Sequence, residues 1–193
     1  MTCGRYAWGH MKEDLDFRPI LTDRLILRRS TSEDAATISG YRSVPDVLRH
    51  QGWDRTDPDS IREEIQEAAG RAPGGRGGWV QFSLEERESG VLVGDVGLSL
   101  ADREPGVIKA GYTVAPEFQG QGYATEAVRA LVAYAFERLD AEVVRAYASA
   151  ENSPSIRVAE NVGMRPVERF EELDGDHVWR GVRYELRRKD SAG

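Results

Sequence analysis

The residues best suited to chemistry form a glycine-containing turn, PEFQGQGYATEA at residues 116–127, which leads into a run of good helix formers. The first N–H groups of an α-helix have no partner within the helix, and the peptide dipoles place a partial positive charge there. Such a turn can bind a phosphate through main-chain donors. Gly120 and Gly122 would let the backbone approach closely, and Thr125 adds a hydroxyl donor. The spacing is equally compatible with a tight turn whose glycines only satisfy backbone geometry.

Carboxylates that could take a proton from a substrate lie at three places along the chain. Asp95 lies in an otherwise apolar strand segment, Glu117 precedes the glycine turn and Glu151 follows a later strand segment. Because the chain contains 33 acidic residues, a solvated surface position is the ordinary interpretation of each. Asp95 fits its apolar surroundings least well, and it is either a general base or a structural hydrogen-bond partner.

Metal and disulfide chemistry have no support in the sequence. The three histidines are far apart, and Cys3 is the single cysteine. No zinc-ligand spacing and no intramolecular disulfide is therefore available. We expect no metal, and this cysteine usage is typical of a reducing cytoplasm.

The glycine turn must be positioned by flanking elements, which can be read from hydrophobic periodicity. A short strand at residues 25–28 is followed by Ser30-x-x-Glu33, a capping box that begins a helix reaching about Tyr41. Asp57 before Pro58 begins a second helix over residues 58–70, and the glycine-rich segment 72–78 follows as a flexible connector. Strands are predicted at residues 79–85, 91–100 and 108–114, as an antiparallel group in front of the turn.

Behind the turn the pattern alternates between helix and strand. Apolar residues on one side predict a helix over residues 125–138, residues 143–149 form a buried strand, and Ser153 caps a short helix at residues 155–162. A last hairpin joins strands at residues 165–172 and 177–186 through Asp174-Gly175. The strand–helix–strand unit over residues 107–149 requires a right-handed crossover, so its two strands are parallel in an otherwise antiparallel sheet.

Length and charge narrow the class of protein. At 193 residues the chain suffices for one core, and we expect one domain at residues 21–187, with an N-terminal extension at 1–20 and a polar tail at 188–193. The net charge of −7 argues against binding to nucleic acid or to an anionic membrane. Since no segment approaches membrane-spanning length and no apolar signal block begins the chain, we expect an unexported, cytoplasmic protein.

The glycine turn resembles a known family signature. Residues 119–124, QGQGYA, match the Q/R-x-x-G-x-G/A signature of the GCN5-related N-acetyltransferases, or GNATs. The run GYTVAPEFQGQGYATEAVRALVAYAF and the block AENSPSIRVAENVGMRP resemble the branch that includes the ribosomal-protein N-terminal acetyltransferases. The resemblance implies a mixed α/β (α+β) single-domain fold, with a mostly antiparallel sheet of six to seven strands, a splayed parallel pair and about four helices. It also implies acetyl coenzyme A (acetyl-CoA) as cosubstrate.

The resemblance assigns roles to residues of this chain. A strand end would bind the pantetheine arm through its main chain, the turn would bind the pyrophosphate, and two residues after the next strand would face the pantetheine and its thiol. In chain order these are Tyr112, Thr113 and Val114; Gln119, Gly120, Gln121, Gly122, Tyr123, Ala124 and Thr125; and Asn152 and Ser155. Many family members use a tyrosine as general acid where this chain has Ala159. In the ribosomal-protein branch the serine of N-x-x-S is the proposed proton donor, so Ser155 is our candidate.

The reaction implied is direct transfer within a ternary complex. A neutral amine attacks the thioester carbonyl, backbone donors near Val114 stabilise the oxyanion, and the thiolate leaves. Asp95 is the first candidate for the base, and Tyr41 and Trp53 are candidates for contact with the acceptor. The acceptor would be a small-molecule amine or a peptide N-terminus, with no nucleic acid or membrane partner. The C-terminal strands could pair in a homodimer.

Two other functions stay open on the sequence. Because Ala159 removes one general acid and no base is assigned, the chain could bind acyl-CoA without turnover. An unrelated nucleotide-binding protein could share the glycine turn, although no Walker-type lysine or Rossmann spacing is present. From composition alone, Asn152 is a turn residue and Ser155 a first-turn helix residue.

Overall fold

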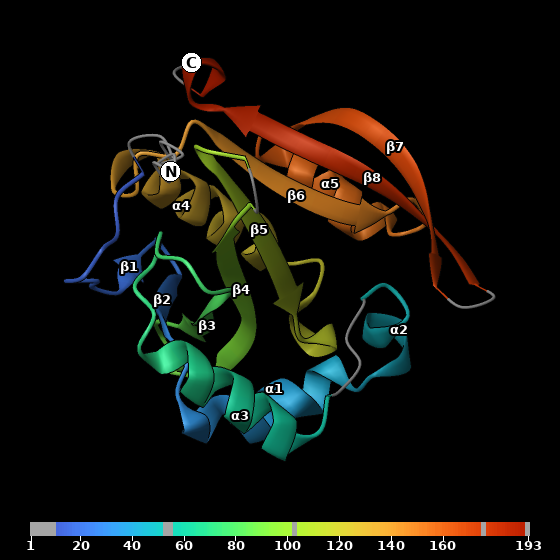
Figure 1. Ribbon diagram of the computed structural model, residues 1–193. Coiled ribbons are helices and arrows are strands. Elements are labelled where there is room, and N and C mark those ends of the chain that lie inside the picture. Colours follow the sequence, from blue (N-terminus) through green and yellow to red (C-terminus); the bar gives the residue numbers. More distant parts are fainter. Residues whose placement is uncertain (1–10, 52–55, 102–103, 175–176, 192–193) are drawn as a thin grey trace, which may run out of the picture.

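The computed structural model describes residues 11–51, 56–101, 104–174 and 177–191, and these form a mixed sheet flanked by helices (Figure 1). Within the described residues the sheet has eight strands in the order β1-β2-β3-β4-β5-β6-β8-β7. Neighbours are antiparallel except β5 and β6, which are parallel. The strands are β1 (Ile20–Leu21), β2 (Leu25–Arg29), β3 (Val80–Glu86), β4 (Leu92–Leu100), β5 (Val107–Val114), β6 (Val143–Ser149), β7 (Arg165–Asp174) and β8 (His177–Arg187).

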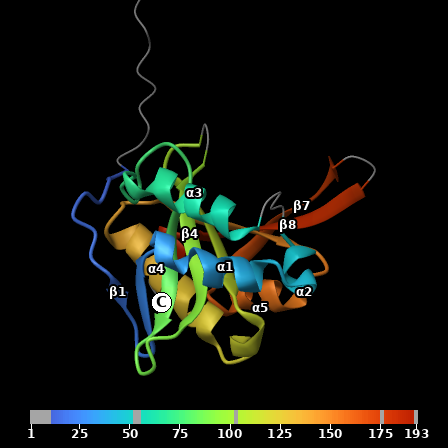
Figure 2. The same cartoon turned by 90° about the horizontal axis from the view of Figure 1, so that it is seen from below.

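The helices cover the two faces of the sheet. They are α1 (Ala35–Arg42), α2 (Pro45–Leu48), α3 (Pro58–Ala69), α4 (Tyr123–Glu137) and α5 (Ser153–Asn161). Alternate residues of β3 and β4 point to opposite faces. Phe82 and Val96 belong to the core beneath α4, whereas Ser83 and Asp95 bond to residues of the α1 region. Figure 2 shows β1 and the β7–β8 hairpin at opposite ends of the molecule.

Helix α4 forms because one side of its sequence is apolar. Ala127, Val128, Leu131 and Ala135 recur at helical spacing and are buried in the same core as Ile108 of β5. Burying each valine or leucine side chain contributes about 1.5–3 kcal/mol. This packing fixes the start of α4 beside the end of β5.

The predicted fold class and the parallel pair are confirmed, and the differences from prediction are local. The sheet has eight strands rather than six to seven, because the two-residue β1 pairs with β2. The predicted capping box Ser30-x-x-Glu33 is wrong: Thr31 and Asp34 form it, and a 3-10 turn (Ser32–Asp34) precedes α1. Asn152, rather than Ser153, caps α5, because its Oδ1 accepts a hydrogen bond from the Ser155 amide.

Residues 11–19, which the sequence places in an extension, pack onto the same core. The Phe17 ring lies 5.0 Å from that of Phe82, and Tyr134 of α4 donates a hydrogen bond of 2.8 Å to Asp14. These contacts bring the beginning of the described chain against α4. Across the described residues, no helix combines the length and apolar character needed to cross a membrane.

Candidate active site

The parallel strands β5 and β6 diverge at one end. Their pairing runs from Val107 with Val143 to Ala110 with Ala146. Both strands continue, β5 to Val114 and β6 to Ser149, but the remainder of β6 pairs only with β8. In Figure 1 the two ribbons separate along this stretch. A gap therefore opens beside residues 111–114.

Main-chain groups of β5 face this gap. Ala115 donates its amide to Val93 of β4 over 2.9 Å, and along an antiparallel strand the groups alternate in direction. Tyr112 and Val114 therefore point their N–H and C=O groups away from β4. Gln119 Nε2 donates to the Val114 carbonyl over 2.9 Å. The Val114 N–H and both main-chain groups of Tyr112 bond to no other described residue, so they can pair with an extended, amide-containing ligand.

The glycine turn enters α4 in a left-handed conformation. Gly120 has φ of +75° and Gly122, the residue before the helix, has φ of +85°. The first bond of the helix runs from the Glu126 amide to the Gly122 carbonyl. The amides of residues 120–125 find no acceptor in the described part of the chain, whereas the Gln119 amide donates to the Pro116 carbonyl over 3.2 Å. The open donors therefore begin at Gly120, and they fit an anion such as a pyrophosphate.

A serine and a phenol meet on the α5 side of the gap. Ser155 Oγ donates a hydrogen bond of 2.9 Å to the Tyr112 hydroxyl, which donates one of 2.9 Å to the Ser155 carbonyl. Burial raises the pKa of Tyr112 to about 12, although the Ser155 hydrogen bond opposes this change. The phenol is therefore protonated at neutral pH. Ala159, at the position where the family resemblance implies a tyrosine, is only 1% exposed and packs in the core.

A cavity of about 420 Å³ lies between strands β3, β4 and β5 and helices α1 and α3, on the face of the sheet opposite α4. Its polar and aromatic lining includes Arg42, Glu64, Glu67, Trp79, Gln81 and Asp95. Trp79 is 39% exposed. Gly97 leaves room for these side chains, because a Cβ there would lie 2.6 Å from Gln81 Oε1 and 3.1 Å from the Trp79 ring. A Cβ on Gly111 would make an ordinary contact with Trp79, at 3.5 Å.

Asp95 forms a buried ion pair with Arg42. It is 3% exposed, Arg42 Nη2 lies 2.6 Å from its Oδ2, and the Tyr41 hydroxyl donates to its Oδ1 over 2.5 Å. Burial raises the pKa of Tyr41, and the Asp95 carboxylate raises it further. Since both oxygens of Asp95 accept hydrogen bonds, the geometry favours the structural role over that of a free base.

The structure separates the predicted acceptor contacts. Tyr41 is 5% exposed and packs with α1 and α3, so it supports Asp95 rather than lining the cavity. Trp53 lies outside the described residues. The base candidates Glu117 and Glu151 are exposed. Trp79 and Gln81 were not among the predicted contacts, because their convergence depends on glycines in two other strands.

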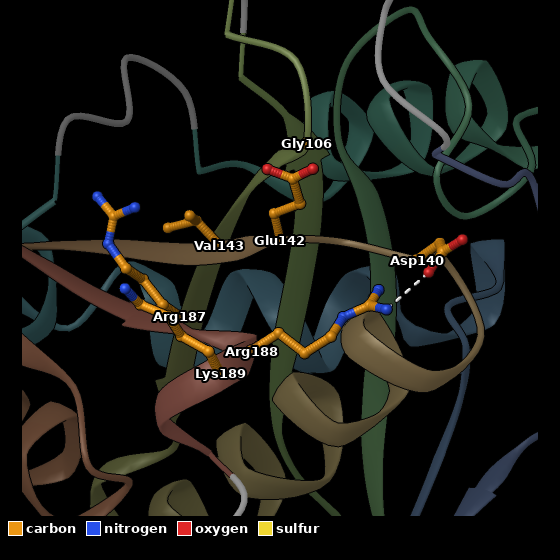
Figure 3. Close-up of a pocket in the computed structure, with 7 residues that line it drawn as sticks. All are labelled: Gly106, Asp140, Glu142, Val143, Arg187, Arg188 and Lys189. Carbon is orange, nitrogen blue, oxygen red and sulfur yellow. Dashed lines mark ion pairs between the residues drawn. The ribbon is translucent and has the colours of Figure 1, made fainter.

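A larger hollow of about 700 Å³ lies at the other end of the parallel strands (Figure 3). Its lining comes from the beginnings of β5 and β6 and the end of β8, where Arg188 pairs with Asp140 over 2.7 Å. None of the predicted site residues lines it. The splayed end of the strands is therefore the better candidate for chemistry.

Comparison with known proteins gives consistent results. Residues 24–165 match the model of a family described as an acetyltransferase (GNAT) domain. The chain is 30% identical over 147 residues to the uncharacterized N-acetyltransferase p20 of Bacillus licheniformis, covering 76% of this chain and 82% of the relative. A GNAT-family acetyltransferase from Bacillus anthracis superposes with a TM-score of 0.78 at 24% identity, covering 89% and 99% of the two chains. Mycobacterium smegmatis RimJ, in complex with CoA-disulfide, gives 0.74 at 22% identity, covering 92% and 93%.

Proposed function

Since this chain belongs to the acetyltransferase (GNAT) family and is an acyltransferase that takes acetyl-CoA as cosubstrate, we propose that it acetylates a primary amine by direct attack in a ternary complex. The amine would belong to a small molecule or to a protein N-terminus. Acceptor and cosubstrate would approach the end of β5 from opposite faces of the sheet.

The observation that carries this proposal is that residues 111–114 border both the cavity and the gap between β5 and β6. Gly111 and Thr113 line the cavity, while the main-chain groups of Tyr112 and Val114 face the gap between β5 and β6. A pantetheine arm paired with these groups would present its thioester at the strand end. An amine in the cavity would reach the thioester carbon across the strand, and orienting two reactants in this way lowers the barrier.

Residues of this chain can stabilise the charges that develop during the transfer. The Val114 N–H would donate to the developing oxyanion as the amine nitrogen bonds to the carbonyl carbon. The C–S bond then breaks, and the sulfur leaves with the bonding electrons. Ser155 Oγ would turn from Tyr112 to donate a hydrogen bond to this sulfur, while the hydrogen bond from the Tyr112 hydroxyl to the Ser155 carbonyl keeps the serine in place. The amine nitrogen loses its proton to a base or to a water chain.

The buried carboxylate that lines the cavity is already engaged in hydrogen bonds. Asp95 lines the cavity, but Arg42 and Tyr41 already donate to its oxygens. We propose that Asp95 fixes the cavity wall and influences the acceptor through its charge rather than by taking the proton directly. Gln81 Oε1 is buried and lacks a hydrogen-bond partner among the described residues, so an acceptor N–H could satisfy it.

The experiment combines turnover with binding. Wild-type protein is incubated with acetyl-CoA and a panel of primary amines and N-terminal peptides while thiol release is followed, and coenzyme A binding is measured by calorimetry. We expect binding and release of one thiol per acetylated amine. Coenzyme A binding without release across both acceptor classes would favour the non-catalytic binding module, and no binding would contradict the whole proposal. The cytoplasmic location and the homodimer stay predictions.

A further inference from the structure

Arg24 contacts the outer side of the glycine turn from a different part of the chain. It lies between β1 and β2, and its Nη1 donates a hydrogen bond of 3.0 Å to the Gln121 carbonyl. Its guanidinium carbon lies 4.5 Å from the centre of the Tyr123 ring. A Cβ added to Gly122 would lie 3.4 Å from its Nη2. One side chain therefore contacts Gln121 and Tyr123 and lies close to Gly122 between them.

The same arginine pairs with a carboxylate in the first turn of α4. Glu126 Oε2 lies 2.6 Å from Arg24 Nη2 and accepts a bond of 2.7 Å from Arg24 Nε. Glu126 Oε1 accepts from the Arg24 amide over 2.9 Å and from the Thr22 hydroxyl over 2.6 Å. Partial burial raises the pKa of Glu126, but these hydrogen bonds outweigh the burial and lower it overall. Glu126 is therefore ionised at neutral pH.

An ionised glutamate at this position has two opposing effects. It stabilises α4, because a negative charge near a helix N-terminus interacts favourably with the helix dipole. It would also repel a diphosphate bound by the amides of the same turn. The positive charge of Arg24 offsets this repulsion while the glutamate stays in place, and its hydrogen bond holds the Gln121 carbonyl.

We propose that Arg24 is a positioning residue for acetyl-CoA: it neutralises Glu126 and fixes the Gln121 carbonyl, so that the amides of residues 120–125 present a net attraction to the pyrophosphate. This inference rests on the proposed function. It assigns Arg24 no contact with the ligand. Its role is exerted through Glu126 and the turn backbone.

The test is a double-mutant cycle of Arg24→Ala and Glu126→Gln, with the Kd for coenzyme A measured by calorimetry and KM measured for each substrate. A repulsion of about 1.4 kcal/mol between unneutralised Glu126 and the pyrophosphate corresponds to about tenfold in affinity. We expect Arg24→Ala to raise the Kd for coenzyme A and the KM for acetyl-CoA about tenfold, with the acceptor KM unchanged. Glu126→Gln should stay within about threefold of wild type.

The double variant decides the mechanism. If Arg24 acts by neutralising Glu126, then Arg24→Ala/Glu126→Gln should bind coenzyme A within about threefold of wild type. A double variant as weak as Arg24→Ala would overturn the proposal, because the loss would then not come from the unneutralised charge of Glu126, and an unchanged Kd in Arg24→Ala would overturn it outright. Failure of wild type to bind coenzyme A would refute the proposed function itself, and this inference with it.

A matched control separates the effect from general loss of an ion pair. Arg180 pairs with Glu171 over 2.9 Å on the exposed β7–β8 hairpin. Arg180→Ala should leave both KM values and the Kd unchanged. Thermal unfolding of every variant is recorded alongside, and Arg24→Lys, which keeps the charge, should recover most of the affinity. An equal loss of affinity in Arg180→Ala would contradict the proposal.

Discussion

The hydroxyl of Ser155 donates its hydrogen bond to the phenol of Tyr112, 2.9 Å away, across the end of the splayed strands. A serine from the first turn of α5 and a tyrosine from β5 are therefore joined by a hydrogen bond, at the position where we propose that the leaving sulfur lies.

Replacement of Ser155 tests this pair directly. Ser155→Ala removes the donor to the departing thiolate, and we expect kcat to fall about a hundredfold, since a positioned acid contributes roughly that factor. Tyr112→Phe retains Ser155 but removes the hydrogen-bond partner of the Ser155 hydroxyl, so we expect a smaller fall in kcat. Steady-state kinetics measure both. A kcat for Ser155→Ala within about threefold of wild type would exclude Ser155 as the donor.

The raised pKa of Tyr112 predicts a loss of stability at high pH. In the folded protein this pKa is about 12, against an ordinary value of 10.0. The folded state therefore keeps a proton that the unfolded state loses, and the free energy of unfolding should fall as pH rises between these values. The contribution lost is about 2–3 kcal/mol. Urea unfolding of wild type and Tyr112→Phe at several pH values measures it, and parallel curves for the two proteins would contradict the prediction.

Asp95→Asn tests whether Asp95 has a structural role or acts as the general base. The change leaves the Arg42 guanidinium buried without its carboxylate, so we expect the free energy of unfolding to fall by about 3 kcal/mol. The acidic limb of the pH–rate profile should persist. As a control, Glu171→Gln breaks an exposed pair and should cost less than about 1 kcal/mol. A hundredfold loss of kcat in an Asp95→Asn protein of unchanged stability would identify Asp95 as the base.

Gly120 and Gly122 can be tested against a glycine outside the site. Alanine in a left-handed conformation costs roughly 1–2 kcal/mol. Gly90 has φ of +70° in the β3–β4 connection and, like Gly120, has open space where the methyl group of an alanine would lie. We expect all three alanine variants to lose similar stability, but only Gly120→Ala and Gly122→Ala to raise the Kd for coenzyme A. A similar rise in Gly90→Ala would show that the effect is general.

Trp79 and Gln81 should determine the acceptor KM. Trp79→Ala removes an aromatic side chain from the cavity wall. Gln81→Leu replaces a buried hydrogen-bond acceptor with an apolar side chain of similar size. We expect each to raise the acceptor KM about tenfold, corresponding to about 1.4 kcal/mol, with the KM for acetyl-CoA unchanged. Val91→Ala, an exposed apolar position in the β3–β4 connection, is the control. A rise confined to acetyl-CoA would contradict the assignment of this cavity to the acceptor.

Helices and strands with a clear hydrophobic periodicity could be predicted from the sequence, but the residues at which they begin and end were predicted less accurately. Strand β6 was predicted at residues 143–149 as found, and α4 was predicted from residue 125 although it begins at Tyr123. Strand β1 and helix α2 were missed, because two and four residues carry too little periodicity. The capping box shifted by one residue since Asp34 also pairs with Arg28 over 2.8 Å.

Some residues of the candidate site could likewise be predicted from the sequence, and others could not. Local sequence marked the glycine turn as a possible anion site, because backbone donors at a helix start depend on residues close together in the chain. The ligand role of the turn and of the N-x-x-S residues was predicted from the family resemblance. The cavity could not be predicted, because Trp79 and Gln81 converge only through the pairing of β3, β4 and β5. Likewise, the partners of Asp95 come from α1, and no local pattern connects Tyr41 and Arg42 to a strand more than 50 residues later.

Strand β7 forms the last strand of the sheet next to β8, and its composition has a consequence for association between molecules. Pro166 has no N–H to offer, the ladder slips between Pro166 and Glu168, and exposed glutamates follow along the strand. A strand from another polypeptide would meet a proline, a register shift and a series of exposed charged side chains. This edge is therefore a poor template for aggregation, which protects an enzyme whose ligand site requires unpaired strand elsewhere.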